Sequence, residues 1–274
     1  MEQIQMPKSL ASMRMELTSD FCEKHQRQHM LFNGKSVCPT CQCETFTAET
    51  VAVVQDEIFD SLRNKNYNML YKQSILQDKT LIHAGFKSYT INVTEGTEEA
   101  RNKEMAFKVF KKYLNGEVFN TWFTGDTGVG KSHLAMSILR SINEMQEFDG
   151  SCVFVDIDEV LRRIKDRFDT NEGPYTERYV IDLMVDADFL VIDDLGAETG
   201  NIGTDKKATD FVSRIIRAVL NGRQEKPTIF TTNLTRESLQ QIYDKKLVSR
   251  AMKNTALIHF TNSKDKRVSQ IELI

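Results

Sequence analysis

The chain has 274 residues, 40% of them hydrophobic and 27% charged, which are ordinary values for a folded protein with a main domain and a small appendage. Its 36 basic and 39 acidic residues give a net charge of −3, which argues against a broadly basic protein that coats nucleic acid. A local basic surface that binds nucleic acid is still compatible with this charge. The apolar runs are too short to cross a bilayer and the N-terminus has no secretory signal pattern, so we expect a cytoplasmic protein with no membrane partner.

Cysteines are concentrated near the N-terminus. Four of the five lie there, and an odd count in a cytoplasmic chain argues against a disulfide framework. The pairs Cys22-x-x-His25 and Cys38-x-x-Cys41 are separated by twelve residues. Two such pairs can hold one Zn²⁺ tetrahedrally, and the metal then supplies folding energy that a short segment lacks. Residues 1–45 are therefore predicted to form a module like a zinc ribbon.

Other ligand sets are compatible with the same cluster. Cys43 is a spare thiol that could replace Cys41 in another register, and His29 is a less well spaced alternative to His25. Unliganded surface thiols are the simplest alternative, but two x-x spacings are improbable by chance in a chain with few cysteines.

The rest of the chain is predicted to be a helical linker over residues 46–100, with a helix around 98–115, and a domain over residues 101–274. From Thr121 onward, short apolar strands without polar alternation are separated by helices. This pattern predicts a parallel sheet covered by helices on both faces, a three-layer α/β sandwich. The predicted strands are 121–123, 152–155, 189–192, 228–231 and 257–260, and the helices between them are 132–145, 160–168, 177–185 and 209–220.

Residues 125–132 read Gly-Asp-Thr-Gly-Val-Gly-Lys-Ser and match the phosphate-loop (P-loop) pattern without a mismatch. Glycines let backbone N–H groups turn toward the nucleotide phosphates, and the following helix adds its positive N-terminal end. Lys131 is expected to neutralise the β- and γ-phosphates and the Ser132 hydroxyl to bind Mg²⁺. A chance glycine-rich turn is the alternative, but a strand before the loop and a helix after it favour ATP or ADP binding. The residues expected to contact the nucleotide are Gly125, Asp126, Thr127, Gly128, Val129, Gly130, Lys131, Ser132 and His133.

A second half of this site is predicted at the strand Leu-Val-Ile that ends in Asp193 and Asp194. Carboxylates at the carboxyl edge of a parallel sheet lie in the crevice where such sheets bind ligands. Asp193 is expected to hold Mg²⁺, directly or through water, and Asp194 to orient or deprotonate the attacking water. A simple turn at the strand end is the alternative, and it is weaker beside a P-loop.

Four segments together resemble the DnaC/DnaI helicase-loader family of P-loop ATPases of the AAA+ type, and its relative, the IstB transposition helper. They are the P-loop, Leu-Val-Ile-Asp-Asp-Leu-Gly-Ala-Glu at 190–198, Lys-Pro-Thr-Ile-Phe-Thr-Thr-Asn-Leu at 226–234 and Val-Ser-Arg at 248–250. The resemblance implies an ATPase that assembles into an oligomer with ATP sites at the subunit interfaces. It also implies binding to the replicative hexameric DNA helicase and its placement on single-stranded DNA.

The resemblance gives expected roles to three further residues. Asn233, at the end of a strand beside the P-loop strand, is expected to touch the γ-phosphate or the attacking water. Arg250 is expected to be an arginine finger on the ATP of a neighbouring subunit, with a solvated helix charge as the alternative. Arg267 loosely matches a nucleotide-sensing segment of the family, although the usual glycine of that segment is missing. Candidate DNA contacts, which a solvated helix face explains equally well, are Lys206, Lys207, Arg214 and Arg217.

Three functions are compatible with these motifs. The metal cluster is similar to the N-terminal module of DnaI-type and phage loaders, which IstB-type proteins generally lack, so a helicase loader is favoured over a transposition helper that binds duplex DNA. A nucleotide kinase could use the same P-loop, but it would need lid arginines and a pocket for the phosphate acceptor.

Overall fold

The computed structural model describes residues 17–32, 34–91, 97–145, 148–197, 210–263 and 265–266. It contains two compact units, Met1–Leu62 and Arg63–Ile274, and the border between them falls inside one long helix. The domain limits at residues 45 and 100 stay a prediction. Among the described residues, no helix is both long and apolar enough to cross a membrane.

The N-terminal unit contains a small antiparallel sheet in the order β1-β2-β3, followed by the start of helix α1. Pro39 suits the first position of this helix, because the N–H that proline lacks would have no helical partner there. Among the side chains described in residues 17–62, the buried ones are Cys22 and Cys38. This unit therefore has no apolar core in its described part. The elements are β1 (Leu17–Cys22), β2 (Arg27–Phe32), β3 (Lys35–Val37) and α1 (Pro39–Gln73).

The second unit is built on five parallel strands in the order β5-β6-β7-β4-β8. Buried apolar side chains lie on both faces of this sheet, which is why it needs a helical layer on each side. Each strand predicted from the sequence lies within an observed one, so the predicted α/β sandwich is confirmed. The strands are β4 (Asn120–Gly125), β5 (Cys152–Asp156), β6 (Phe189–Asp193), β7 (Thr228–Thr232) and β8 (Thr255–Phe260).

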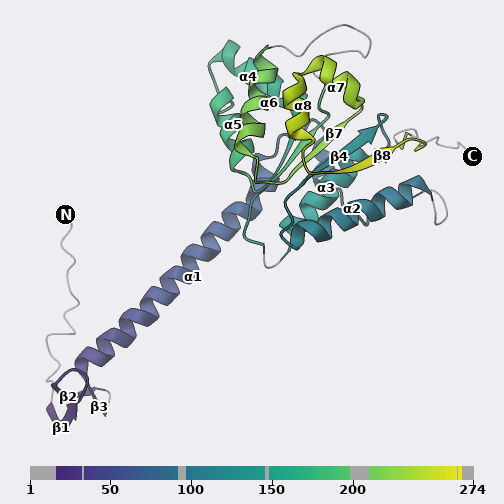
Figure 1. The fold of residues 1–274 in the computed structure, drawn as a ribbon. Helices are drawn as coiled ribbons and strands as arrows, with labels where there is room; N and C mark the ends of the chain where they lie inside the picture. The colour runs from purple at the N-terminus through teal and green to yellow at the C-terminus, as the bar shows by residue number, and fades with distance from the viewer. Residues whose placement is uncertain are drawn as a thin grey trace, which may run out of the picture. The chain divides into compact units, whose positions relative to one another are not determined.

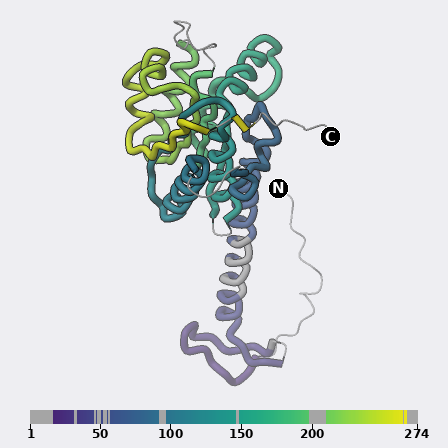
Figure 2. Tube along the Cα trace, turned by 90° about the vertical axis from the view of Figure 1, so that its right-hand side faces the viewer, coloured from purple at the N-terminus to yellow at the C-terminus, as the bar shows by residue number. Residues whose placement is uncertain are grey.

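The helices form the two outer layers (Figure 1), and their order along the chain can be followed by colour in Figure 2. Helices α2 and α3 pack on one face of the sheet against residues such as Phe123 and Phe154. Helices α4 to α8 pack on the other face, around Trp122 and Phe230. The helices are α2 (Glu98–Leu114), α3 (Lys131–Asn143), α4 (Ile157–Thr170), α5 (Glu177–Asp186), α6 (Asp210–Gly222), α7 (Arg236–Ile242) and α8 (Lys245–Ala251), with a 3₁₀ helix η2 (Lys79–His83) before them.

A buried arginine ties the α5 layer to the sheet. Arg223 is 3% exposed, and its guanidinium donates to the carbonyls of Met184 at 2.8 Å and Pro227 at 2.7 Å, to that of Ala187, and to the Thr228 hydroxyl at 3.0 Å. These acceptors belong to the end of α5 and the start of β7, where backbone carbonyls lack helical or strand partners. Burial lowers the pKa of Arg223 to about 10, so the side chain stays charged at neutral pH.

Arg223→Met is expected to lower the free energy of unfolding by about 3 kcal/mol or more, because several carbonyls would stay buried without a donor. Urea unfolding of the full chain measures this value. The matched control is Arg178→Met, whose side chain is 92% exposed and should change stability by less than about 0.5 kcal/mol. Equal effects of the two substitutions would contradict the role given to Arg223.

Candidate nucleotide and zinc sites

The P-loop lies between the end of β4 and the start of α3, as predicted. Gly130 has φ 96° and caps α3 in the left-handed conformation. A Cβ atom at this position would lie 2.7 Å from the ring of Tyr89, so both the backbone and the space require glycine. The loop therefore leads directly into a helix N-terminus, which favours bound anions.

The side chain of Lys131 folds back onto the P-loop. Its side chain is buried, and Nζ donates to the carbonyls of Gly125 at 2.8 Å and Asp126 at 2.7 Å. The ammonium group is thus held at the loop, where an anionic phosphate would be a stronger acceptor than a neutral carbonyl.

The two predicted carboxylates follow each other at the carboxyl end of β6. Asp193 is buried and accepts a hydrogen bond from the Thr231 hydroxyl at 2.6 Å. Burial, followed by the charge of Asp194, raises the pKa of Asp193 to about 7. Asp194 has φ 53°, a left-handed conformation that Asp tolerates better than most residues, and its N–H donates to the Thr231 hydroxyl at 2.9 Å. The structure thus brings Lys131, Ser132, Asp193 and Asp194 together.

A third carboxylate near this edge was not predicted from the sequence. Asp156 ends β5, lies opposite Asp193 in the parallel register, and accepts from the N–H of Glu159 at 3.0 Å as the cap of α4. Burial raises the pKa of Asp156, and the charge of Asp194 adds to this increase. A cap residue before a helix is common, so the sequence carried no signal for a place beside Asp193.

The cleft beside the P-loop is lined on its other side by a segment that was predicted only as a linker. Ser88, Tyr89 and Thr90 face Thr127, Gly128 and Lys131 across it, and Asp78 and Leu81 contribute from the region of η2. Their sequence has neither a motif nor a charge pattern, so only the tertiary fold could place them here. The described residues that line the cleft are Asp78, Leu81, Ser88, Tyr89, Thr90, Thr127, Gly128, Gly130, Lys131, Ser132, His133, Asp194 and Lys266.

His133 lines this cleft and also contacts the segment around Ser88 on its other side. Its Nε2 atom lies 3.2 Å from the Gly85 carbonyl and 3.1 Å from the Ser88 hydroxyl, and its ring meets Tyr89 edge-on. Burial lowers the pKa of His133, which favours the neutral ring. The predicted nucleotide contact at this position therefore coexists with a packing role.

The segment after β8 also reaches the P-loop. The N–H of Lys266 donates to the Gly128 carbonyl at 3.0 Å, and its Nζ lies 3.6 Å from the centre of the Tyr89 ring and 3.2 Å from Glu99. Lys266 thus occupies the cleft next to the position where the sequence analysis placed a nucleotide sensor. Arg267 itself lies outside the described residues.

Two other predicted residues lie away from the cleft lining. Asn233 follows β7 directly and is half-buried. Arg250, on α8, is exposed and donates to the Asn221 side chain at 2.5 Å. Neither side chain lines the cleft in the part of the chain that the structure describes. Among the DNA-contact candidates, Arg214 pairs with Glu177 at 2.8 Å, and Lys206 and Lys207 fall outside the described residues.

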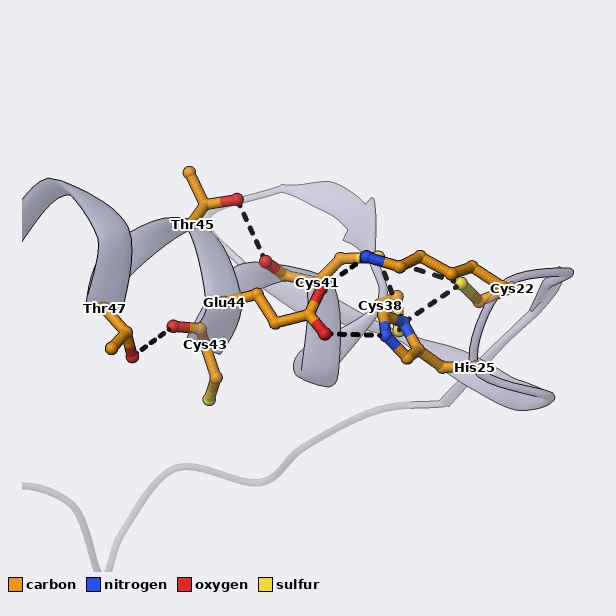
Figure 3. Close-up of polar contacts among 9 residues, drawn as sticks. Cys22, His25, Cys38, Cys41, Cys43, Glu44, Thr45 and Thr47 are labelled. Atoms are coloured by element: carbon orange, nitrogen blue, oxygen red, sulfur yellow. Dashed lines mark hydrogen bonds and ion pairs between the residues drawn. The ribbon is translucent and has the colours of Figure 1, made fainter.

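The four predicted zinc ligands converge in the N-terminal unit (Figure 3). Cys22 ends β1, His25 lies in the turn to β2, Cys38 follows β3 and Cys41 lies in the first turn of α1. Their ligand atoms all lie within 4.8 Å of one another. The second pair is therefore held by a helix start and not by a second hairpin knuckle as in the predicted ribbon, because Pro39 begins α1 between the two cysteines.

The spacing of these atoms fits a tetrahedral zinc ion. A metal with Zn–S bonds of about 2.3 Å requires sulfur atoms about 3.8 Å apart, and slightly shorter sulfur–nitrogen distances. Cys22 Sγ lies 3.8 Å from Cys41 Sγ, and His25 Nδ1 lies 3.3–3.7 Å from the three sulfur atoms. The N–H of Cys41 lowers the pKa of the Cys38 thiol to about 6, whereas burial raises the pKa of the Cys41 thiol to about 11, so the fit to a metal rests on the spacing of the ligand atoms. The residues present fit Zn²⁺.

The alternative ligands lie outside this cluster. Cys43 is exposed and its sulfur points away from the other three thiols (Figure 3). His29 lies on β2, where its Nδ1 atom is 3.4 Å from the Ser36 hydroxyl. The geometry thus favours the set of Cys22, His25, Cys38 and Cys41.

A parallel sheet in the order β5-β6-β7-β4-β8, with a P-loop after strand β4 and paired carboxylates after β6, defines a nucleotide-binding domain of the AAA+ type. The chain belongs to the family of IstB-like ATP binding proteins, whose family model matches residues 53–265.

Individual relatives agree with this assignment. The replicative helicase loader DnaC of Escherichia coli strain K12 is 25% identical over 170 residues, which are 61% of this chain and 62% of that protein, so less than two thirds of the relative is matched. A crystal structure of the DnaC helicase loader has a TM-score of 0.52 at 22% identity and covers 67% of this chain and 100% of that chain. A candidate primosome component from Streptococcus pyogenes serotype M3 has a TM-score of 0.52 at 18% identity, covering 69% and 92%. These structures share the fold.

The purified chain is expected to contain about one zinc ion, and Cys38→Ser should lose it because a tetrahedral site needs all four ligands. Metal analysis of the full chain after dialysis measures the content. Cys43→Ser is the matched control and should keep its zinc, since this thiol lies outside the cluster. Loss of zinc from Cys43→Ser would show that the ligand set is wrong.

Proposed function

We propose that the chain is an ATP-dependent loader that binds a replicative DNA helicase and helps to place it on single-stranded DNA in the bacterial cytoplasm. The observation that carries this proposal is the combination of an ATP-binding domain related to the helicase loader DnaC with a separate N-terminal unit that holds four metal ligands. Such an accessory unit is suited to contact a partner while the second unit binds nucleotide.

Residues in the cleft and at the strand ends beside it are of the kinds that ATP hydrolysis needs. Lys131 would neutralise the β- and γ-phosphates, and Asp194 would orient or deprotonate the attacking water. The hydroxyl of Ser132 and the carboxylate of Asp193 lie at the same end of the sheet and are oxygen ligands of the kind that Mg²⁺ prefers. Bound Mg²⁺ would neutralise phosphate charge. Asn233 would contact the γ-phosphate or the water from the end of β7.

Arg250 cannot serve the cleft of its own chain. The P-loop follows the carboxyl end of β4, whereas Ala251, next to Arg250, accepts hydrogen bonds from Asn120 and Trp122 at the amino end of that strand. The six residues of β4 span about 16 Å at about 3.3 Å per residue step. A role as an arginine finger therefore requires a second copy of the chain, which supports an oligomer with ATP sites between subunits.

Lys131→Ala is expected to abolish ATP binding, because it removes the cation that the loop holds at the phosphate position. Arg250→Ala should leave ATP affinity within about threefold and lower the hydrolysis rate at least about 100-fold, since a finger stabilises charge that develops in the transition state. Nucleotide binding by fluorescence and phosphate release are the two measurements. Normal hydrolysis by Arg250→Ala would exclude the finger.

The full chain is expected to co-purify with the cognate replicative helicase in the presence of ATP and Mg²⁺, and a variant without residues 1–62 should not. Lys131→Ala serves as the control for the nucleotide requirement. If neither form binds the helicase and the full chain instead binds duplex DNA tightly with ATP, the chain is a transposition helper of the IstB type and the loader proposal fails.

A further inference from the structure

His25 makes polar contacts through both ring nitrogen atoms. Nδ1 faces the sulfur atoms of Cys22, Cys38 and Cys41, and Nε2 lies 3.0 Å from Oε1 of Glu44 (Figure 3). The side chain of His25 is 15% exposed, so the ring is largely enclosed between the thiols and this carboxylate. A neutral histidine that donates Nε2–H to a carboxylate presents the lone pair of Nδ1 to the opposite side.

Helix α1 positions Glu44 for its contact with His25. Glu44 follows Cys41 by three residues on α1, so both side chains project from the same face one turn apart. The same helix thus supplies one predicted metal ligand directly and holds another, His25, through its second nitrogen.

The other oxygen of Glu44 is also held. Lys24, the neighbour of His25 in the β1–β2 turn, donates to Oε2 at 2.7 Å. Because the two carboxylate oxygens have different partners in the same turn, the carboxylate has little freedom to rotate. The turn that carries Cys22 and His25 is thereby fastened to the start of α1, which carries Cys41.

We propose that Glu44 is a positioning residue of the zinc site: it accepts the Nε2–H of His25, fixes the tautomer whose Nδ1 binds the metal, and orients the ring toward the three sulfur atoms. Carboxylates in this position raise the basicity of the ligating histidine, and their loss typically weakens metal binding about 10–100-fold. This inference depends on the metal cluster and not on the helicase-loading role.

A purely structural role would give a different pattern of effects. If Glu44 only fastened the turn through its surface ion pair, Lys24→Ala would weaken metal binding as much as Glu44→Ala does. The exposed pair alone should contribute little, because both side chains are more than half exposed, 68% for Lys24 and 51% for Glu44.

The test uses the full chain and measures zinc affinity by competition with a chelator of known affinity, together with the visible spectrum of the Co²⁺-substituted protein. Glu44→Ala is expected to weaken zinc binding about 10–100-fold and to change the Co²⁺ bands. Glu44→Gln should recover most of the affinity, because its amide oxygen still accepts Nε2–H. Lys24→Ala and Glu23→Gln, a charge control in the same turn, should change affinity less than about threefold.

Three results would overturn the proposal. These are an unchanged zinc affinity in Glu44→Ala, an equal loss in Lys24→Ala, or a loss in Glu44→Gln as large as that in Glu44→Ala. A Glu44→Ala protein that needs excess metal to fill its site and then shows altered Co²⁺ bands, while Glu44→Gln shows neither change, supports it. None of these outcomes depends on helicase binding or ATP hydrolysis, so the inference can fail while the loader proposal stands.

Discussion

The hydroxyl of Thr231 holds the carboxylate half of the nucleotide site in place. It donates to Asp193 at 2.6 Å and accepts from the N–H of Asp194 at 2.9 Å, while the Thr231 carbonyl accepts from Leu195 at 2.9 Å. This residue belongs to β7, which lies between the P-loop strand β4 and the carboxylate strand β6. Strand order and one hydroxyl group thus decide where the buried carboxylate lies at the sheet edge.

The N-terminal unit depends on a different constraint. Its described part buries the two thiols Cys22 and Cys38 but no aliphatic or aromatic side chain, and Leu17, Phe21 and Leu31 are exposed. Such a segment cannot gain enough from apolar burial to offset the entropy of ordering its chain. Bonds from the four ligands to a metal ion would supply the stability that apolar burial does not.

The sequence predicted the second unit well because its signals are local. The strand at 189–192 is apolar on both faces, and the P-loop must lie between a strand and a helix, so both could be placed without knowing the fold. The three-stranded sheet of the N-terminal unit was not predicted, since its strands are short and do not alternate apolar with polar residues.

Long-range contacts explain what the sequence could not reveal. Tyr89 precedes the P-loop by more than thirty residues and reaches the Val129 carbonyl at 3.3 Å, while Lys266 arrives from the far end of the domain and covers the Tyr89 ring. Glu44 is likewise an ordinary helix residue in the sequence, and only the turn at His25 gives it a partner. These residues come into contact only when the whole domain folds, and the periodicity of the sequence does not predict such contacts.

The position of Arg250 links these local features to assembly. It is held at 2.5 Å by Asn221 of α6, on the edge of the sheet opposite the P-loop, and so a single chain has a cleft beside its P-loop and a distant exposed guanidinium. In a ring or helix of identical subunits, a head-to-tail contact could place each guanidinium at the next cleft. Hydrolysis would then require a correctly placed neighbour, and nucleotide binding would not. If nucleotide binding and hydrolysis were controlled separately, a loader would bind its partner in one nucleotide state and dissociate from it in the other.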